Sequence, residues 1–193
     1  MSEITEDHLE WAVVRRLAIM LETPDPQFNV THAYGMLAPI VCWVMQRTRA
    51  KDGPAATLRN TLIIDSPWNL SHFHIRRFKP GLITSERSLA AYDFFIGLRN
   101  AIAHGDARKV KPINSPPDSK DRCTLEGFSF ECEAYTSRPP RPPTMLWSGT
   151  IHLLEADIRR LGLELADQFC INLGVKKPNF SIIASERIRE PAT

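Results

Sequence analysis

The segment from residue 84 to residue 104 is apolar around nearly its whole circumference when it is drawn as an α-helix. Thr84 or Ser85 can cap its start, Glu86 lies in the first turn, and Gly105 is expected to end it. A helix that is apolar on nearly all sides must be buried on several of them, so other elements have to pack around it. Its apolar side chains are Leu89, Tyr92, Phe94, Phe95, Ile96, Leu98 and Ile102.

A narrow polar stripe interrupts this apolar helix. Asp93, Gly97, Asn100 and His104 follow one another at spacings of four, three and four residues and fall in line. Glycine costs about 1 kcal/mol relative to alanine inside a helix, so Gly97 indicates that another backbone or a ligand comes close. Asn100 and His104 are one turn apart and can hydrogen-bond. Arg99 lies about 140° around the helix from His104, so a second copy of the chain could bring the two residue types together across a two-fold axis.

Three further long helices and two strands are predicted from periodicity. Apolar residues recur at helical spacing in three segments, residues 5–21, 29–51 and 153–173. Asn29 can cap the second of these helices, and Pro39 should kink or divide it. Residues 123–134 alternate between apolar and polar and indicate a strand, with a return strand at 145–151.

These elements predict a mainly α protein. We expect a four-helix bundle with a small β-hairpin, inserted at about residues 121–151, before the last long helix. The intervening segments are predicted as a short helix at 55–64, an irregular stretch at 66–80 and a proline-containing loop at 111–120. A length of 193 residues indicates one domain, assigned to residues 1–175, followed by a loosely ordered tail at 176–193.

Composition indicates the cellular compartment and argues against a zinc site built from cysteines. The N-terminus lacks the basic and then apolar pattern of a signal peptide, and no apolar run is long enough to span a bilayer. We therefore expect a cytoplasmic protein with reduced thiols. The four cysteines contain no CxxC pair, which argues against a zinc ribbon, although a disulfide between Cys123 and Cys132 remains an alternative.

Basic residues gather in short clusters although the net charge is only +2. Such clusters form a phosphate-binding face or merely a solvated surface. Trp68, Phe73 and Phe78 interleave with one cluster, which is typical either of a base-stacking loop or of a loop that folds its aromatic rings onto the core. His72 and His74 form a weak metal-binding candidate. The candidate RNA contacts are Arg76, Arg77, Lys79, Arg108 and Lys109.

The hexapeptide Arg99-Asn100-Ala101-Ile102-Ala103-His104, near the end of a helix, resembles the Arg-Asn-x-x-x-His signature of the HEPN superfamily. The resemblance implies a HEPN-like helical bundle that acts as a homodimer and cleaves RNA without a metal or other cofactor. It also implies a role as a toxin or phage-defence effector, with an antitoxin or a nucleotidyltransferase as a candidate partner. Some bacterial members carry a tyrosine two residues past the histidine, where this chain has Asp106.

The implied reaction is attack of the RNA 2′-OH on the adjacent phosphorus, which leaves a 2′,3′-cyclic phosphate. His104 would transfer a proton, Arg99 would hold the phosphate, and Asn100 would orient His104 or donate to phosphate. Asp93 and Gly97 are expected to support the site or line the dimer seam. Two alternatives stay open: a non-catalytic HEPN-like module that binds RNA, a nucleotide or a protein, and a dimeric helical scaffold in which the stripe only packs helices.

Overall fold

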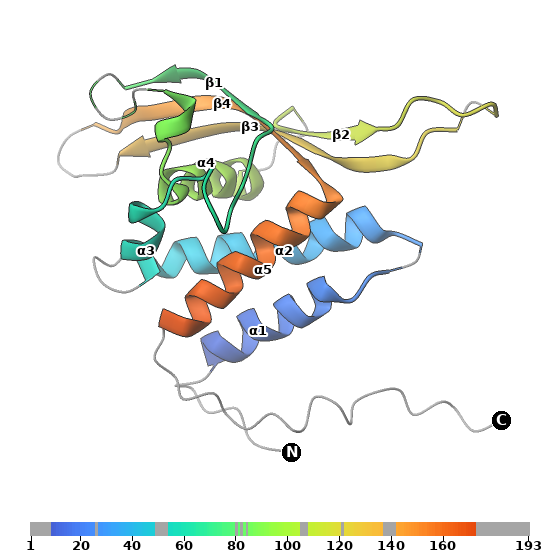
Figure 1. The fold of residues 1–193 in the computed structure, drawn as a ribbon, viewed down its shortest axis with the longest axis horizontal. Coiled ribbons are helices and arrows are strands. Elements are labelled where there is room, and N and C mark those ends of the chain that lie inside the picture. The colour runs from blue at the N-terminus through green and yellow to red at the C-terminus, as the bar shows by residue number, and fades with distance from the viewer. Residues whose placement is uncertain are drawn as a thin grey trace.

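The fold combines helices with a β-sheet. A computed structural model describes residues 9–25, 27–48, 54–79, 81, 83, 85–104, 108–120, 122–136 and 142–172. These residues form five α-helices and one four-stranded antiparallel sheet, so the expected mainly α four-helix bundle is wrong. In Figure 1 the sheet forms one layer, α4 lies directly beneath it, and α2, α5 and α1 follow on the same side. The predicted tail at 176–193 lies outside the described residues.

The four long helices lie close to where periodicity places them. Pro39 is inside α2, which continues through it as one helix, and Asn29 is the first residue of that helix rather than its cap. The amide of Asn29 instead bonds to the carboxylate of Glu155 at 2.5 Å. The helices are α1 (Leu9–Glu22), α2 (Asn29–Arg47), α3 (Pro54–Asn60), α4 (Ala91–Ala103) and α5 (Glu155–Asn172).

Helix α4 begins at Ala91, later than the predicted start at Thr84 or Ser85. A short 3₁₀ helix, Glu86–Ser88, occupies the preceding segment. The backbone N–H of Ala91 then donates to the carbonyl of Thr61 at 2.9 Å, and the carbonyl of Leu89 accepts from Ile63 at 3.0 Å. These bonds hold residues 89–91 beside residues 61–63, so the backbone groups that would extend the helix toward its N-terminus are already paired.

The sheet has the strand order β1-β4-β3-β2. Its strands are β1 (Phe73–Phe78), β2 (Val110–Asn114), β3 (Leu125–Thr136) and β4 (Thr144–Leu154), and all neighbours are antiparallel. The predicted hairpin is therefore present as β3 and β4, but these are the two long central strands of a sheet rather than a small insertion. An irregularity between Ala134 and Tyr135 shifts the register of β3 against β4.

Both edge strands fall in segments that were predicted to lack regular structure. β1 lies within residues 66–80, and its alternation is broken by a register shift between Ile75 and Arg77. β2 overlaps the predicted loop at 111–120 and contains Pro112. An edge strand tolerates a proline because the missing N–H need not reach a second neighbour.

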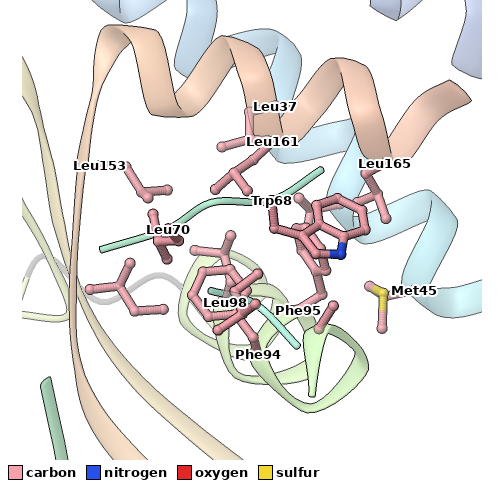
Figure 2. Packing of buried hydrophobic residues seen from close by; sticks show 14 of the residues in the cluster. Leu37, Met45, Trp68, Leu70, Phe94, Phe95, Leu98, Leu153, Leu161 and Leu165 are labelled. Atoms are coloured by element: carbon pink, nitrogen blue, oxygen red, sulfur yellow. The ribbon is translucent and has the colours of Figure 1, made fainter. Parts of the chain in front are cut away.

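The core lies between the sheet and the helices. Figure 2 shows Trp68, Phe94, Phe95 and Leu98 packed beneath α5. The Trp68 and Phe95 rings meet edge to face, with centroids 5.1 Å apart and planes at 72°. Each such pair contributes about 0.5–1.5 kcal/mol beyond the burial of its area. In the described part of the chain, no helix combines the length and apolar character that crossing a membrane requires.

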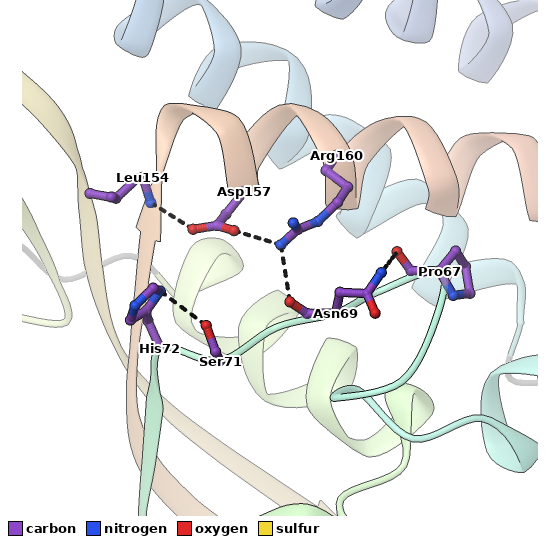
Figure 3. Close-up of polar contacts among 7 residues, drawn as sticks. All are labelled: Pro67, Asn69, Ser71, His72, Leu154, Asp157 and Arg160. Atoms are coloured by element: carbon purple, nitrogen blue, oxygen red, sulfur yellow. Dashed lines mark hydrogen bonds and ion pairs between the residues drawn. The ribbon is translucent and has the colours of Figure 1, made fainter.

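The loop before β1 is fastened to the start of α5. Figure 3 shows Arg160 between this helix and the loop: its guanidinium donates to Asp157 at 2.6 Å and to the carbonyl of Asn69 at 3.4 Å. Asp157 also accepts from the backbone N–H of Leu154 at 3.4 Å, which satisfies a free donor at the start of the helix. Asn69 has a φ of 45°, a left-handed conformation that asparagine adopts more readily than most residues.

Candidate functional site

The polar stripe of α4 faces the sheet of its own chain. A Cβ built on Gly97 would lie 2.4 Å from Cζ2 of Trp147, so the glycine makes room for this indole. The Trp147 Nε1–H also donates to the backbone carbonyl of Asp93 at 3.0 Å. The sequence predicts the approach of another backbone or a ligand at Gly97, and the structure instead places the Trp147 side chain of β4 there.

Asp93 lies in the first turn of α4, where its carboxyl is largely desolvated. Burial raises the pKa of Asp93 above its usual value, and the nearby positive charge of Arg59 lowers it by less. The Arg59 guanidinium lies over the Tyr92 ring, 4.4 Å from its centroid. Asp93 is thus far along α4 from His104, and its environment disfavours the charged form.

Asn100 connects α4 to the edge of β3. Its side-chain Nδ2 donates to the backbone carbonyl of Glu133 at 2.9 Å, and its Oδ1 accepts from Nη1 of Arg99 at 3.3 Å. Among the described residues, no bond joins the side chains of Asn100 and His104. Asn100 therefore positions a strand rather than an imidazole.

His104 ends α4 with its side chain exposed. It is the C-terminal cap residue, and its backbone N–H donates to the carbonyl of Asn100 at 3.1 Å. Gly105 and Asp106, the predicted helix stop and the position of the family's tyrosine, lie outside the described residues.

A small hollow opens beside His104, at the junction of α4 and β3. Its volume is about 190 Å³. Among the described residues, the last hydrogen bond between the segment of β2 and β3 runs from the N–H of Glu131 to the carbonyl of Lys109, one residue before β2 begins. Because the hollow lies beside the C-terminal end of α4, we call this feature the C-terminal hollow. It is lined by Asn100, Ala101, His104, Lys109, Glu133 and Tyr135.

One carboxylate oxygen of Glu133 contacts both a basic and a hydroxyl side chain of the C-terminal hollow. Oε2 of Glu133 lies 3.6 Å from Nζ of Lys109 and accepts a hydrogen bond from the Tyr135 hydroxyl at 3.3 Å. Partial burial raises the pKa of Tyr135, and the negative charge of Glu133 raises it further. The side chains of Lys109 and Glu133 are 37% and 44% exposed, so this pair is open to water and can exchange for a ligand at little cost.

Arg99 is not among the residues that line the C-terminal hollow. Its guanidinium lies near α2, where its charge lowers the pKa of Cys42 by less than burial raises it. Its Nε is buried and has no hydrogen-bond partner, while Nη1 donates to Asn100. Among the described residues, Arg99 is connected to the hollow through Asn100.

The other basic candidates are spread over the surface. Arg76 pairs with Glu131 on the sheet, Arg77 and Arg108 are exposed, and Lys109 lines the hollow. Lys79 is partly buried at the end of β1. The structure thus brings Lys109 together with His104 and Asn100.

The aromatic residues of the proposed base-stacking loop pack mostly into the fold. Trp68 is fully buried and Phe73 packs against the core, whereas Phe78 is 42% exposed. Two of the three rings therefore follow the alternative in which the loop folds onto the core.

Sequence reasoning missed Glu133 and Tyr135. The predicted alternation matches burial at Phe130, Cys132 and Ala134, whereas Gly127 is buried and Phe128 is only partly buried. The alternation carries no information about which helix end lies at the strand edge. Contact with Asn100, which is 33 residues away in sequence, appears only in three dimensions.

Metal-ligating side chains are not clustered in the described part of the chain. There, no three His, Cys, Asp or Glu side chains are grouped closely enough to hold a metal ion, and His72 and His74 are no exception. All four cysteines are free thiols, so Cys123 and Cys132 are not joined by a disulfide.

Comparison of the chain with protein-family models, curated protein sequences and solved structures found no match.

Proposed function

We propose that the protein is a HEPN-type endoribonuclease that cleaves RNA without a metal ion, at the C-terminal hollow. The observation that carries the proposal is the placement of an exposed His104 in one small hollow with Asn100 and Lys109. An imidazole transfers protons near neutral pH, and an ammonium group binds and neutralises a phosphate. The products would be a 2′,3′-cyclic phosphate and a free 5′-hydroxyl.

The proposal gives Arg99 two roles. In one protomer it holds Asn100, which in turn fixes the edge of β3. In a homodimer, the Arg99 of a second copy would approach the phosphate bound beside His104, where a guanidinium offers paired donors. Replacing Arg99 therefore removes both the support of the hollow and any contact across the dimer.

The test is cleavage of end-labelled single-stranded RNA in EDTA by wild type, His104→Ala and Arg99→Ala. The matched control is His152→Ala, which removes an exposed histidine of β4. We expect His104→Ala to lose activity by a factor of about 10² or more, since general acid–base groups contribute about 10²–10⁴-fold. Circular dichroism establishes that each variant is folded. Equal cleavage by wild type and His104→Ala would contradict the proposal.

One observation favours the alternative of RNA binding without cleavage: among the described residues, Arg99 does not line the hollow that His104 lines. A binding module would still use Lys109 as a phosphate contact. In that case RNA affinity falls with salt, Lys109→Ala reduces the salt slope by about 0.7 for single-stranded RNA, and no cyclic-phosphate product forms. The product assay separates the two functions.

A further inference from the structure

The C-terminal hollow holds a carboxylate as well as an imidazole. Glu133 comes from β3 and His104 from the end of α4, and both line the same space of about 190 Å³. We propose that Glu133 is the general base and His104 the general acid of one RNA-cleaving site. This inference rests on the proposed function, and it adds a catalytic residue outside the Arg99–His104 motif.

The backbone of Glu133 is fixed from α4. Its carbonyl accepts from Asn100, and Asn100 is itself held by Arg99. This anchor uses the main chain, so the carboxylate remains available to the hollow. The register of β3 against β4 places Glu133 opposite Ser148, and the irregularity follows one residue later, at Ala134 and Tyr135. A shift of this kind re-aims the next side chain, and the Tyr135 hydroxyl does reach Glu133.

The two oxygens of the Glu133 carboxylate have different surroundings. Lys109 and Tyr135 both contact Oε2. In the described part of the chain, Oε1 has no hydrogen-bond or ion-pair partner, so it can accept a proton from a substrate hydroxyl. The contacts at Oε2 orient the carboxylate while Oε1 does the chemistry.

The titratable and charged groups around Glu133 come from three directions. Lys109 precedes β2, His104 ends α4, and Tyr135 follows on β3. The thiol of Cys132, next in sequence, is buried, and burial is the main cause that raises its pKa, ahead of the charges of neighbouring carboxylates. Of these groups, the carboxylate of Glu133 can accept a proton and the imidazole of His104 can donate one, so a base and an acid line the same space.

The reaction balances within this pair. Oε1 of Glu133 takes the proton of the RNA 2′-hydroxyl as the 2′-oxygen forms a bond to phosphorus. The bond from phosphorus to the 5′-oxygen breaks, and the His104 imidazolium gives its proton to that leaving oxygen. Lys109 neutralises charge on the phosphate. The enzyme ends with a protonated Glu133 and a neutral His104, and proton exchange with water restores both.

The test compares Glu133→Gln with the matched control Glu131→Gln across the pH range. Glu131 is the neighbouring carboxylate on β3, and it pairs with Arg76 and Thr150 away from the hollow. We expect kcat to fall about 10²–10⁴-fold in Glu133→Gln, with loss of the acid-side limb of the pH profile. We expect Glu131→Gln to keep both the rate and that limb. Glu133→Asp should restore part of the rate together with the limb.

Binding separates a chemical role from a structural one. RNA carrying 2′-O-methyl groups lacks the proton that Glu133 removes, so we expect wild type and Glu133→Gln to bind it with affinities within about threefold of each other. A rate in Glu133→Gln equal to wild type, or an acid-side limb that persists in it, would overturn this inference while leaving the proposed function intact. No cleavage by wild type would overturn both. A parallel loss of RNA affinity and folding in Glu133→Gln would show a structural role only.

Discussion

The side-chain amide of Asn100 donates to the backbone carbonyl of Glu133 at 2.9 Å, and this bond joins the last turn of α4 to β3. The residue that the sequence motif placed beside a catalytic imidazole therefore acts first on the sheet. It holds the strand that carries the other half of the proposed site.

Replacing Asn100 by alanine should lower the free energy of unfolding by about 1–2 kcal/mol, because the carbonyl of Glu133 loses its donor. The matched control is Asn114→Ala at an exposed position of β2, where a change within about 0.5 kcal/mol is expected. Urea denaturation measures both. Equal effects of the two substitutions would show that the bond between α4 and β3 contributes nothing.

Two glycine-to-alanine substitutions should change stability in opposite directions. At Gly97 the new methyl would collide with the Trp147 ring, and overpacking of this kind costs about 1–3 kcal/mol. At Gly35, in α2, a Cβ meets nothing within 4 Å, so alanine should stabilise by about 0.5–1 kcal/mol through helix propensity. Thermal unfolding gives the sign of each. A stabilising Gly97→Ala would contradict the described packing of α4 on β4.

Asp93→Asn should stabilise the protein increasingly as pH rises from below 3.8 toward neutrality. Burial raises the pKa of Asp93 in the folded state, ahead of the opposing effect of Arg59. Above pH 3.8 the unfolded chain ionises this group first, so the folded state loses stability that the asparagine variant keeps.

Asp118→Asn provides a control of opposite sign. Hydrogen bonds from the backbone N–H and the side chain of Arg122 lower the pKa of Asp118, so its stabilising effect is present above pH 3.8 and lost as pH falls. Unfolding measured at several pH values should give difference curves of opposite slope for the two variants. Parallel curves would contradict the described burial of Asp93.

The cysteines should differ sharply in reactivity. Cys123 is exposed, whereas burial raises the pKa of the Cys170 thiol to about 11 and the pKa of the buried Cys132 thiol further. Because the thiolate is the reactive form, an alkylating reagent at pH 8 should modify Cys123 first and Cys132 only after unfolding. Mass spectrometry of peptides follows each site. The rate at Cys170 should rise about tenfold per pH unit up to about pH 11.

Helices and strands whose apolar residues recur at regular spacing could be predicted from the sequence. Strands in which this spacing is interrupted could not. β3 shows alternation over most of its length, so the sequence indicates it, and the long helices repeat apolar residues at regular spacing. β1 changes register after Ile75, and β2 contains Pro112 at a sheet edge. The register change in β1 and the proline in β2 each interrupt the alternation that identifies a strand from its sequence. The hydrogen bonds to a strand distant in sequence still form.

The candidate site divides in the same way. Asn100 and His104 belong to the sequence motif and Lys109 to a basic cluster, so sequence alone points to all three residues. Glu133 and Tyr135 enter through a strand edge whose neighbour is decided by tertiary packing. The position of Arg99 illustrates the limit of helical geometry: its angle around α4 excludes it from the hollow, but only the fold shows that it acts through Asn100.

The strand order implies a sequence of events during synthesis. β1 is made early, yet its neighbour in the sheet is β4, with His74 opposite Thr150. A nascent chain that has not yet reached residue 144 therefore carries residues 73–78 without their pairing strand, even when α1 and α2 are complete. Chains that are interrupted before β4 should expose this basic, aromatic segment to chaperones and proteases.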